Sequence, residues 1–323
     1  MRAHLADLRG QDGQAIVLLI AILSVLVGFG GLVLDGGRWF HMQRRLQTAA
    51  DAAALAAVQD LPSASTAVAT TDANQYAQTN YNGATAAVTF PQTPTSTCST
   101  VTFSCVRVVA SKTAPLTLTK VLKPLLSNVT VSAKAMAAVT IPTMFKNVAP
   151  VAVKNTVACT TPSCFGTSKT VSFDESSVAS STIGLINLTC HATALPACAN
   201  NNNVGATDLR DWIINGFADA LPSGQWYGVK TGQNVGPIKQ GFDAQIGVKL
   251  FFPVFDQTQS IGSVWYFHII GWSAFVIDEV VSWSPSTKTL RGHFVTFTTS
   301  DLPAGTPPSG SNDFGVRVLS LVE

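Results

Sequence analysis

Six cysteines are the residues of this sequence whose type and spacing are best suited to covalent chemistry. They form three close pairs along the chain, which are Cys98 and Cys105, Cys159 and Cys164, and Cys190 and Cys198. An even number of closely spaced cysteines is typical of disulfide-closed loops that form in an oxidising compartment. We therefore predict disulfides at these positions. Pairing between nearest neighbours is a hypothesis, because six cysteines allow other connectivities.

A metal site is the alternative chemistry for some of the same residues. It would use Cys159, Cys164, Cys190 and His191 as ligands. The CxxC spacing that is typical of structural zinc sites is missing. The sequence therefore favours disulfides, and we predict no metal and no cofactor.

Catalytic motifs are not found in the sequence. It contains no HExxH motif and no GxxxxGK phosphate-binding loop. Gly271–Phe275 imitates a nucleophile elbow but lacks the second glycine. His268 and His293 could meet Asp256 or Asp278 near a serine, which would make an anchored hydrolase. Histidines in a strand-rich, aromatic segment are more often structural, so we predict that the protein is not an enzyme.

The longest uncharged stretch is Ala15–Leu34, which contains twenty residues. A helix of that length spans about 30 Å, the thickness of the hydrocarbon core of a bilayer. Cleaved signal peptides have shorter apolar regions of about 7–15 residues. Here Arg38, Arg44 and Arg45 follow the stretch, as in a stop-transfer sequence. We predict a retained transmembrane helix over residues 15–34, preceded by residues 1–14, with membrane lipid as a partner.

Particular residues are assigned to this anchor and its exit from the membrane. The predicted membrane-anchor residues are Ala15, Leu18, Ile22, Val25 and Leu34, and the predicted interfacial residues are Asp35, Trp39, Arg44 and Arg45. Ser24 and Gly28 form a small-xxx-small pair, which indicates possible self-association through the N-terminal helix. Arg2 and Arg9 precede the stretch and Arg38, Arg44 and Arg45 follow it, so the positive-inside count taken alone favours a C-terminal part inside the cytoplasm. All six cysteines follow it, which places the later residues in an oxidising space.

Helical and strand patterns follow the anchor. Arg44–Leu61 is predicted to be helical because it is rich in alanine and has no glycine or proline before Pro62. Its alanine stripe suits close packing against the protein's own sheet or against a neighbouring molecule. Helical spacing continues over residues 63–82, and a short helix is predicted at Leu116–Leu126. The predicted strands of this part are Ala86–Phe90, Thr100–Ser111 and Asn128–Ile141.

The later part of the chain is predicted to be rich in strands. Thr207–Leu221 has an apolar stripe at helical spacing, with Thr207 as its cap, and Pro222–Gly241 reads as a loop. The predicted strands are Ala244–Val254, Val264–Ile270, Trp272–Trp283, Leu290–Thr299 and Gly315–Val322. Val264–Ile277 is too short for a second membrane span and is predicted to be a buried strand pair bent at Gly271.

These elements predict the α+β fold class. A transmembrane helix continues into a pilin-like helix and a small antiparallel sheet over residues 35–147, and a β-rich, disulfide-containing domain follows over residues 148–323. Charged residues make up 12% of the chain and the net charge is +2. This balance gives no electrostatic case for binding nucleic acid.

The first sixty residues resemble the N-terminal region of TadE/TadG-like proteins of bacterial tight-adherence (Flp) pilus assembly systems. The features that match are Gly13-Gln14, Asp35-Gly36, the aromatic and basic residues that follow, and Leu46-Gln-Thr-Ala-Ala-Asp-Ala-Ala-Ala-Leu-Ala56. The segments Asp211-Trp212, Gly236–Ile238, Phe252–Asp256 and His268–Phe275 resemble a domain of TadG-related proteins. Two family features are missing. Leu18 stands where pseudopilin relatives have an acidic residue, which favours an unprocessed anchor, and Asp174–Val178 does not complete the DxSxS metal motif of larger relatives.

The resemblance implies a single-pass protein of the bacterial cytoplasmic (inner) membrane with its C-terminal body outside the cytoplasm. It also implies a structural or assembly role in a Flp-type pilus or a related envelope secretion apparatus, with pilus or secretion-apparatus subunits as partners. The alternative function is an envelope-anchored adhesin or carbohydrate-binding module. Exposed rings at Trp226 or Trp283 would favour that alternative, because aromatic side chains form platforms for sugars.

Overall fold

The computed structural model describes residues 12–61, 65–91, 104–115, 129–198, 201, 203–232, 235–285, 288–300, 302 and 312–322. The chain divides into two compact units. The first unit is formed by Met1–Ala57, Ala67–Thr89 and Val106–Met136. The second is formed by Val58–Thr66, Phe90–Cys105 and Ala137–Glu323.

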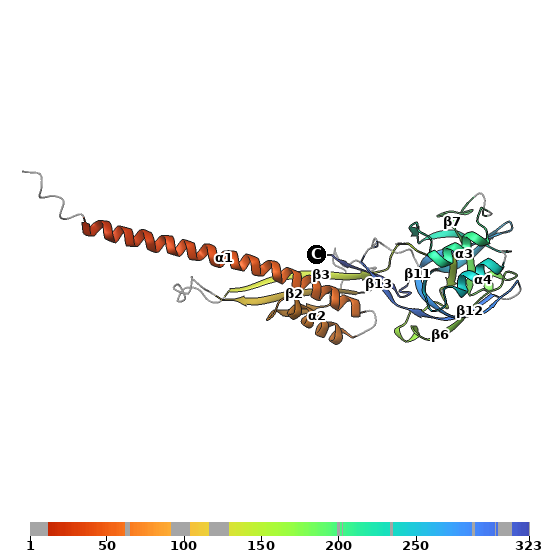
Figure 1. Ribbon diagram of the computed structural model, residues 1–323, viewed down its shortest axis with the longest axis horizontal. Coiled ribbons are helices and arrows are strands. Elements are labelled where there is room, and N and C mark those ends of the chain that lie inside the picture. Colours follow the sequence, from red (N-terminus) through yellow and green to blue (C-terminus); the bar gives the residue numbers. More distant parts are fainter. Residues whose placement is uncertain are drawn as a thin grey trace, which may run out of the picture. The chain divides into compact units, whose positions relative to one another are not determined.

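The chain begins with one continuous helix, α1, which runs over Asp12–Asp60 (Figure 1). Its 49 residues correspond to about 73 Å of helix at 1.5 Å per residue. The apolar stretch and the alanine-rich stretch therefore form one helix, as predicted. The helix ends just before Pro62, and the residue that precedes a proline is disfavoured in the helical conformation.

The rest of the first unit is one further helix and a small sheet. Helix α2 covers Thr66–Asn80, and the strands are β1 (Thr85–Thr89), β2 (Ser104–Ala114) and β3 (Val129–Thr140). Strand β2 pairs with β1 in antiparallel register and also neighbours β3. α1 lies beside β3, where Gln47 Nε2 donates a hydrogen bond of 2.9 Å to the carbonyl of Lys134. The helix predicted at Leu116–Leu126 lies outside the described residues.

Strands dominate the second unit. They are β4 (Met144–Phe145), β5 (Val151–Lys154), β6 (Ser168–Phe173), β7 (Ile183–Ala192), β8 (Leu221–Pro222), β9 (Gln225–Val229), β10 (Lys249–Ile261), β11 (Val264–Trp283), β12 (Lys288–Val295), β13 (Phe297–Thr299) and β14 (Val316–Leu321). The helices are α3 (Ala206–Asn215) and α4 (Val235–Asp243), and short 3-10 turns occur at Pro162–Cys164 and Val178–Ser180.

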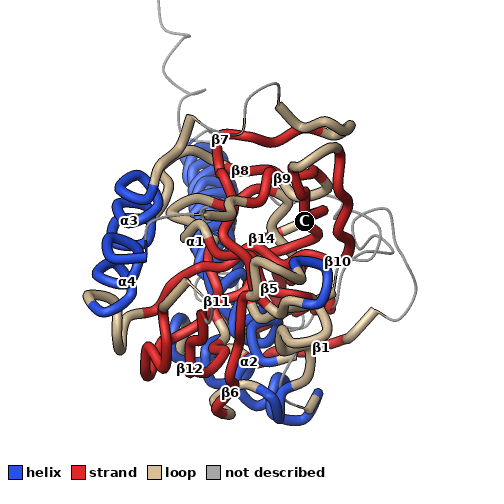
Figure 2. The backbone as a smooth tube through the Cα atoms, turned by 90° about the vertical axis from the view of Figure 1, so that its right-hand side faces the viewer, coloured by secondary structure: helices blue, strands red, loops and turns tan. Residues whose placement is uncertain are grey.

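Five strands of this unit close on one another. Strand β10 pairs with β5, β5 with β7, β7 with β9, β9 with β11, and β11 again with β10. This hydrogen-bonded ring is a small barrel, and β12 and β6 extend the sheet beyond β11. Figure 2 shows α3 and α4 side by side next to these strands. Closure of the ring leaves these five strands with fewer unpaired edges, because backbone groups that would face solvent are paired.

Aromatic side chains fill the interior of the second unit. The rings of Phe255 and Phe267 stack with their centres 4.0 Å apart, and those of Phe252 and Phe275 stack at 5.3 Å. Trp272 is fully buried. Rings of this size remove large apolar areas from water, which is the main stabilising term for such a core.

Two boundaries predicted for this region are wrong. Helix α3 ends at Asn215 and not at Leu221, because Gly216 takes a φ of 73° that ends the helix. Gly205, and not Thr207, is at the N-cap, where its N–H bonds Asp208. The interval predicted as a loop over residues 222–241 contains strand β9 and most of α4.

The aromatic segment at Val264–Ile277 lies in one long strand, β11, as part of the barrel. The bend predicted at Gly271 coincides with shifts of register in the β10–β11 ladder, between Val254 and Phe255 and again before Gln257. A β-carbon at Gly271 would meet the ring of Phe314 at 3.0 Å. The segment is therefore a buried strand, as predicted, but it is one continuous strand and not the predicted pair.

Candidate functional site

The alanine stripe of α1 packs inside the first unit. Ala49, Ala50, Ala53, Ala54 and Ala57 are all fully buried. Small side chains allow a helix axis to come close to its neighbour, so the stripe brings α1 near the sheet that carries Lys134. Of the two alternatives for this stripe, the structure shows packing within the protein's own chain.

The side chains in the N-terminal half of the same helix are exposed, in contrast to the buried alanine stripe. Leu18, Ile22, Val25 and Leu34 are between 50 and 61% exposed, and Ala15 is exposed as well. A helix that is apolar on all sides is normally buried in a protein or in a membrane. By length and composition, α1 is able to cross a membrane.

The residues predicted to lie at the membrane interface differ in their surroundings. Arg44 and Arg45 are exposed, and Trp39 is half-buried. Asp35 is buried, with 1% of its surface exposed. The guanidinium of Arg45 lies 5.8 Å from the centre of the Tyr81 ring, within the range of a cation–π contact.

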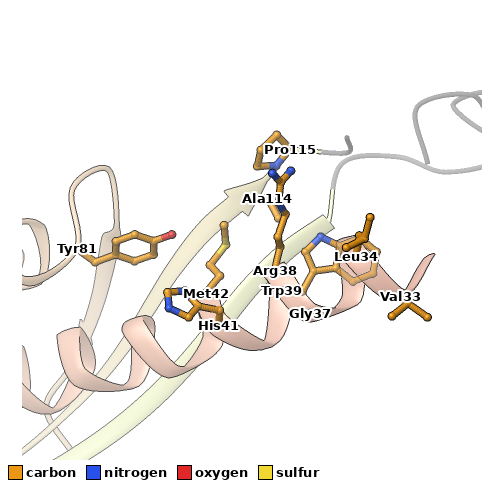
Figure 3. Close-up of a pocket in the computed structure, with 10 residues that line it drawn as sticks. All are labelled: Val33, Leu34, Gly37, Arg38, Trp39, His41, Met42, Tyr81, Ala114 and Pro115. Atoms are coloured by element: carbon orange, nitrogen blue, oxygen red, sulfur yellow. The ribbon is translucent and has the colours of Figure 1, made fainter. Parts of the chain in front are cut away.

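A groove with a volume of about 530 Å³ lies beside α1 just after the exposed apolar stretch (Figure 3). We call it the exit groove. Its lining residues are Val33, Leu34, Gly37, Arg38, Trp39, His41, Met42, Tyr81, Ala114 and Pro115. In Figure 3, Arg38 extends from α1 toward Ala114 and Pro115 at the end of β2. No pattern in the sequence indicates this groove, because Tyr81 and Ala114 reach it only through the tertiary fold.

Among the described residues of the second unit there are two disulfides, and each joins cysteines that are neighbours in the sequence. Cys159 is bonded to Cys164, and Cys190 is bonded to Cys198. The alternative metal site is therefore wrong, because three of its four ligands are held in disulfides. Among the described residues, no group of three or more His, Cys, Asp and Glu side chains is placed to hold a metal ion. Cys98 lies outside the described residues, so its pairing with Cys105 stays a prediction.

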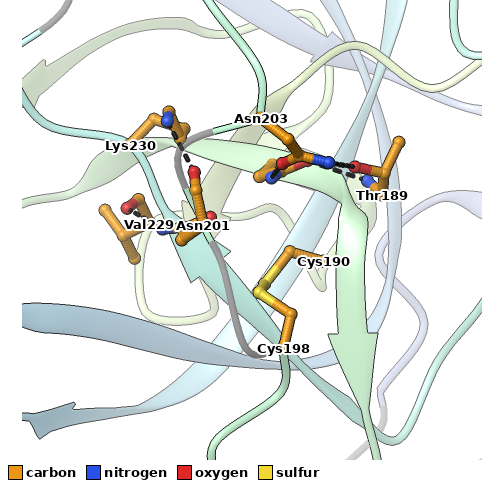
Figure 4. The surroundings of a disulfide bond; sticks show 8 residues. Thr189, Cys190, Cys198, Asn201, Asn203, Val229 and Lys230 are labelled. Atoms are coloured by element: carbon orange, nitrogen blue, oxygen red, sulfur yellow. Dashed lines mark hydrogen bonds between the residues drawn. A yellow bond between two sulfur atoms is a disulfide. The ribbon is translucent and has the colours of Figure 1, made fainter.

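Polar contacts surround the Cys190–Cys198 bond (Figure 4). The ammonium of Lys230 donates a hydrogen bond of 2.7 Å to the carbonyl of Asn201, and Asn201 Nδ2 donates to the carbonyl of Val229. The fully buried Asn187 donates a hydrogen bond from its Nδ2 to Asn203 Oδ1. Burial of Lys230 lowers the pKa of its ammonium. The segment after Cys198 is thus tied to β9 and β7 by side chains as well as by the disulfide.

The two histidines considered for catalysis lie in separate pairs. His268 Nδ1 is 2.8 Å from Asp256, and His293 Nδ1 is 3.1 Å from Asp278. Each pair joins neighbouring strands, β11 to β10 in the first case and β12 to β11 in the second. Contacts of this kind tie strands together, which accords with the structural role favoured for these histidines.

The two tryptophans considered as sugar platforms are not both exposed. Trp283 is buried, and its ring packs against Phe242 at 4.6 Å. Trp226 is half-buried and lies 5.1 Å from the ring of His268. The observation that would have favoured a carbohydrate-binding module is therefore missing at Trp283.

Comparison with known proteins bears on the N-terminal helix. Residues 13–60 match the family described as putative Flp pilus-assembly TadE/G-like. This match confirms the resemblance of the first sixty residues and supports a role related to pilus assembly. No curated protein and no solved structure matched the chain. The resemblance of the C-terminal segments to TadG-related proteins stays a prediction.

The matched residues, which we call the Tad-like segment, coincide almost completely with α1. They include the exposed apolar half and the buried alanine half. The Tad-like segment is therefore a single helix. The side chains of its first half, around Leu18–Leu26, are exposed, and its second half packs into the first unit.

Proposed function

We propose that this protein is a membrane-anchored structural component of a Flp-type (tight-adherence) pilus assembly apparatus. Residues 15–34 cross the inner membrane once, residues 1–14 remain in the cytoplasm, and the body stands outside. The observation that carries the proposal is α1 itself, whose apolar half is exposed while its other half is buried in the protein. Exposure of such an apolar surface to water is unfavourable, whereas its contact with the hydrocarbon of a bilayer is not.

The orientation is supported by the two disulfides of the second unit. Disulfides persist in the periplasm and are rare in the cytoplasm, where thiols are kept reduced. On this proposal the pilin-like part is the first unit, which contains α1, α2 and a small antiparallel sheet. Pilus or secretion-apparatus subunits are then the partners of the exported surface, and the exposed half of α1 is available for self-association in the bilayer.

Deletion of residues 14–35 tests the proposal in the native host. We expect the deletion variant to lose membrane association and to abolish piliation, measured by carbonate extraction of membranes and by electron microscopy of surface pili. A matched control replaces residues 15–34 by an unrelated apolar helix of equal length. Membrane association should return with this control, and any remaining loss of piliation would report on specific helix contacts. Normal piliation by the deletion variant would overturn the proposal.

A further inference from the structure

The exit groove combines an apolar wall with cationic and aromatic side chains. Val33 and Leu34 are 71% and 60% exposed and continue the apolar surface of α1 into the groove. Arg38, Trp39 and His41 follow within two turns of the same helix, and Tyr81 comes from the turn after α2. An apolar surface that leads directly into a polar site is suited to an amphipathic ligand.

The charges at the exit groove are of one sign. Arg38 lines it and no carboxylate does. Arg45 and Lys112 approach the Tyr81 ring to within 5.8 and 4.2 Å of its centre. Asp35, which lies one turn before Arg38, is buried and does not line the groove. A ligand that complements this groove therefore carries negative charge at its polar end.

The position of these residues along α1 matches the position of lipid phosphates. Arg38 is four residues beyond Leu34, which is about 6 Å along the helix axis. The polar headgroup region extends about 5–8 Å beyond the hydrocarbon core on each side. The half-buried ring of Trp39 lines the groove at this level of the helix, where aromatic side chains are enriched at membrane interfaces.

We propose that the exit groove binds an anionic phospholipid of the membrane leaflet on the side where the body stands. Arg38 holds the headgroup phosphate, the ring of Trp39 lies beside the headgroup, and an acyl chain lies along Val33 and Leu34. A volume of about 530 Å³ is in the range of small-molecule sites. This inference rests on the proposed membrane anchoring and adds a specific lipid contact to it.

Native mass spectrometry of the full-length protein, released from nanodiscs of phosphatidylglycerol and phosphatidylcholine in equal amounts, tests the inference. We expect the wild type to retain phosphatidylglycerol several-fold more than phosphatidylcholine. Arg38→Ala should lower this retention about tenfold. Arg44→Ala is the matched control, because it removes the same charge from an exposed position outside the groove and should leave retention unchanged. Equal effects of the two substitutions, or equal retention of the two lipids, would overturn the lipid site.

Two further measurements separate the possible failures. Trp39→Ala removes the ring that lines the groove, so it should weaken retention severalfold; unchanged retention would remove Trp39 from the site. Loss of the bound lipid in excess inorganic phosphate would show that the groove recognises phosphate alone, which contradicts a lipid site. Flotation with liposomes reports on the anchor independently. A wild-type protein that does not float overturns both proposals, whereas one that floats but shows no lipid preference overturns only this one.

Discussion

Leu46 of α1 is one of the largest fully buried side chains of the first unit. It is fully buried, on the same helix as five buried alanines. An alanine removes little apolar surface from water, whereas a buried leucine removes several times more. The packing of α1 against the unit therefore depends strongly on a few larger side chains, of which Leu46 and Met136 are the largest that are fully buried.

Replacement of Leu46 by alanine is expected to destabilise the first unit by about 2–5 kcal/mol, because it leaves a cavity between α1 and its neighbours. Hydrogen exchange of the amides in residues 42–57, measured in detergent, should speed up accordingly. Leu32→Ala is the matched control, since Leu32 is 51% exposed on the same helix. Similar exchange in the two variants would show that Leu46 does not hold α1 in place.

Among the elements, the segment that contains the Cys190–Cys198 bond joins β7 to the region before α3. The bond closes a loop with a sequence separation of 8 residues. Closing a loop of this size reduces the entropy of the unfolded chain and stabilises the fold by about 2–3 kcal/mol in the chain-entropy model. The bonds from Lys230 and Asn201 act on the same segment.

The double substitution Cys190→Ser, Cys198→Ser is therefore expected to lower the stability of the second unit by about 2–3 kcal/mol. Urea unfolding followed by tryptophan fluorescence reports on this unit, because five of the six tryptophans follow residue 210. Thr193→Ala changes an exposed side chain in the same loop and serves as the control. An unfolding midpoint equal to that of the control would argue against a stabilising role for the bond.

Elements with local signals could be predicted from the sequence, and those that depend on distant partners could not. Helix α1 follows from an uncharged run and an alanine stripe that end before Pro62, and β3 from simple alternation. Strand β9 was missed inside a glycine-rich interval, because its two neighbours, β7 and β11, are distant in sequence. The end of α3 was missed because Gly216 ends the helix although the apolar stripe continues to Leu221. The exit groove had no local signal, since Tyr81 and Pro115 join it from separate segments.

At the scale of the whole molecule, the compartment of the body decides whether its disulfides form. We expect Cys159, Cys164, Cys190 and Cys198 of the wild type to resist a maleimide reagent until a reductant is added. Removal of residues 14–35 should leave the body in the cytoplasm, where the same thiols react without reductant. Gel shifts with maleimide-polyethylene glycol measure this difference. Reactive thiols in the wild type, or protected thiols in the deletion variant, would contradict the proposed topology.

The unbroken course of α1 has a mechanical consequence. The helix is continuous at the adjacent glycines Gly30-Gly31 and Gly36-Gly37, a kind of position where kinks are common, so its two halves share one axis (Figure 1). Membrane-crossing helices tilt by about 20° on average, and they adjust this tilt to the thickness of the bilayer. Because α1 is helical throughout residues 34–42, a change of its tilt in a thicker or thinner bilayer would change the inclination of β2 and β3 by the same angle as that of the helix. The thickness of the bilayer would thereby change the direction in which the first unit points.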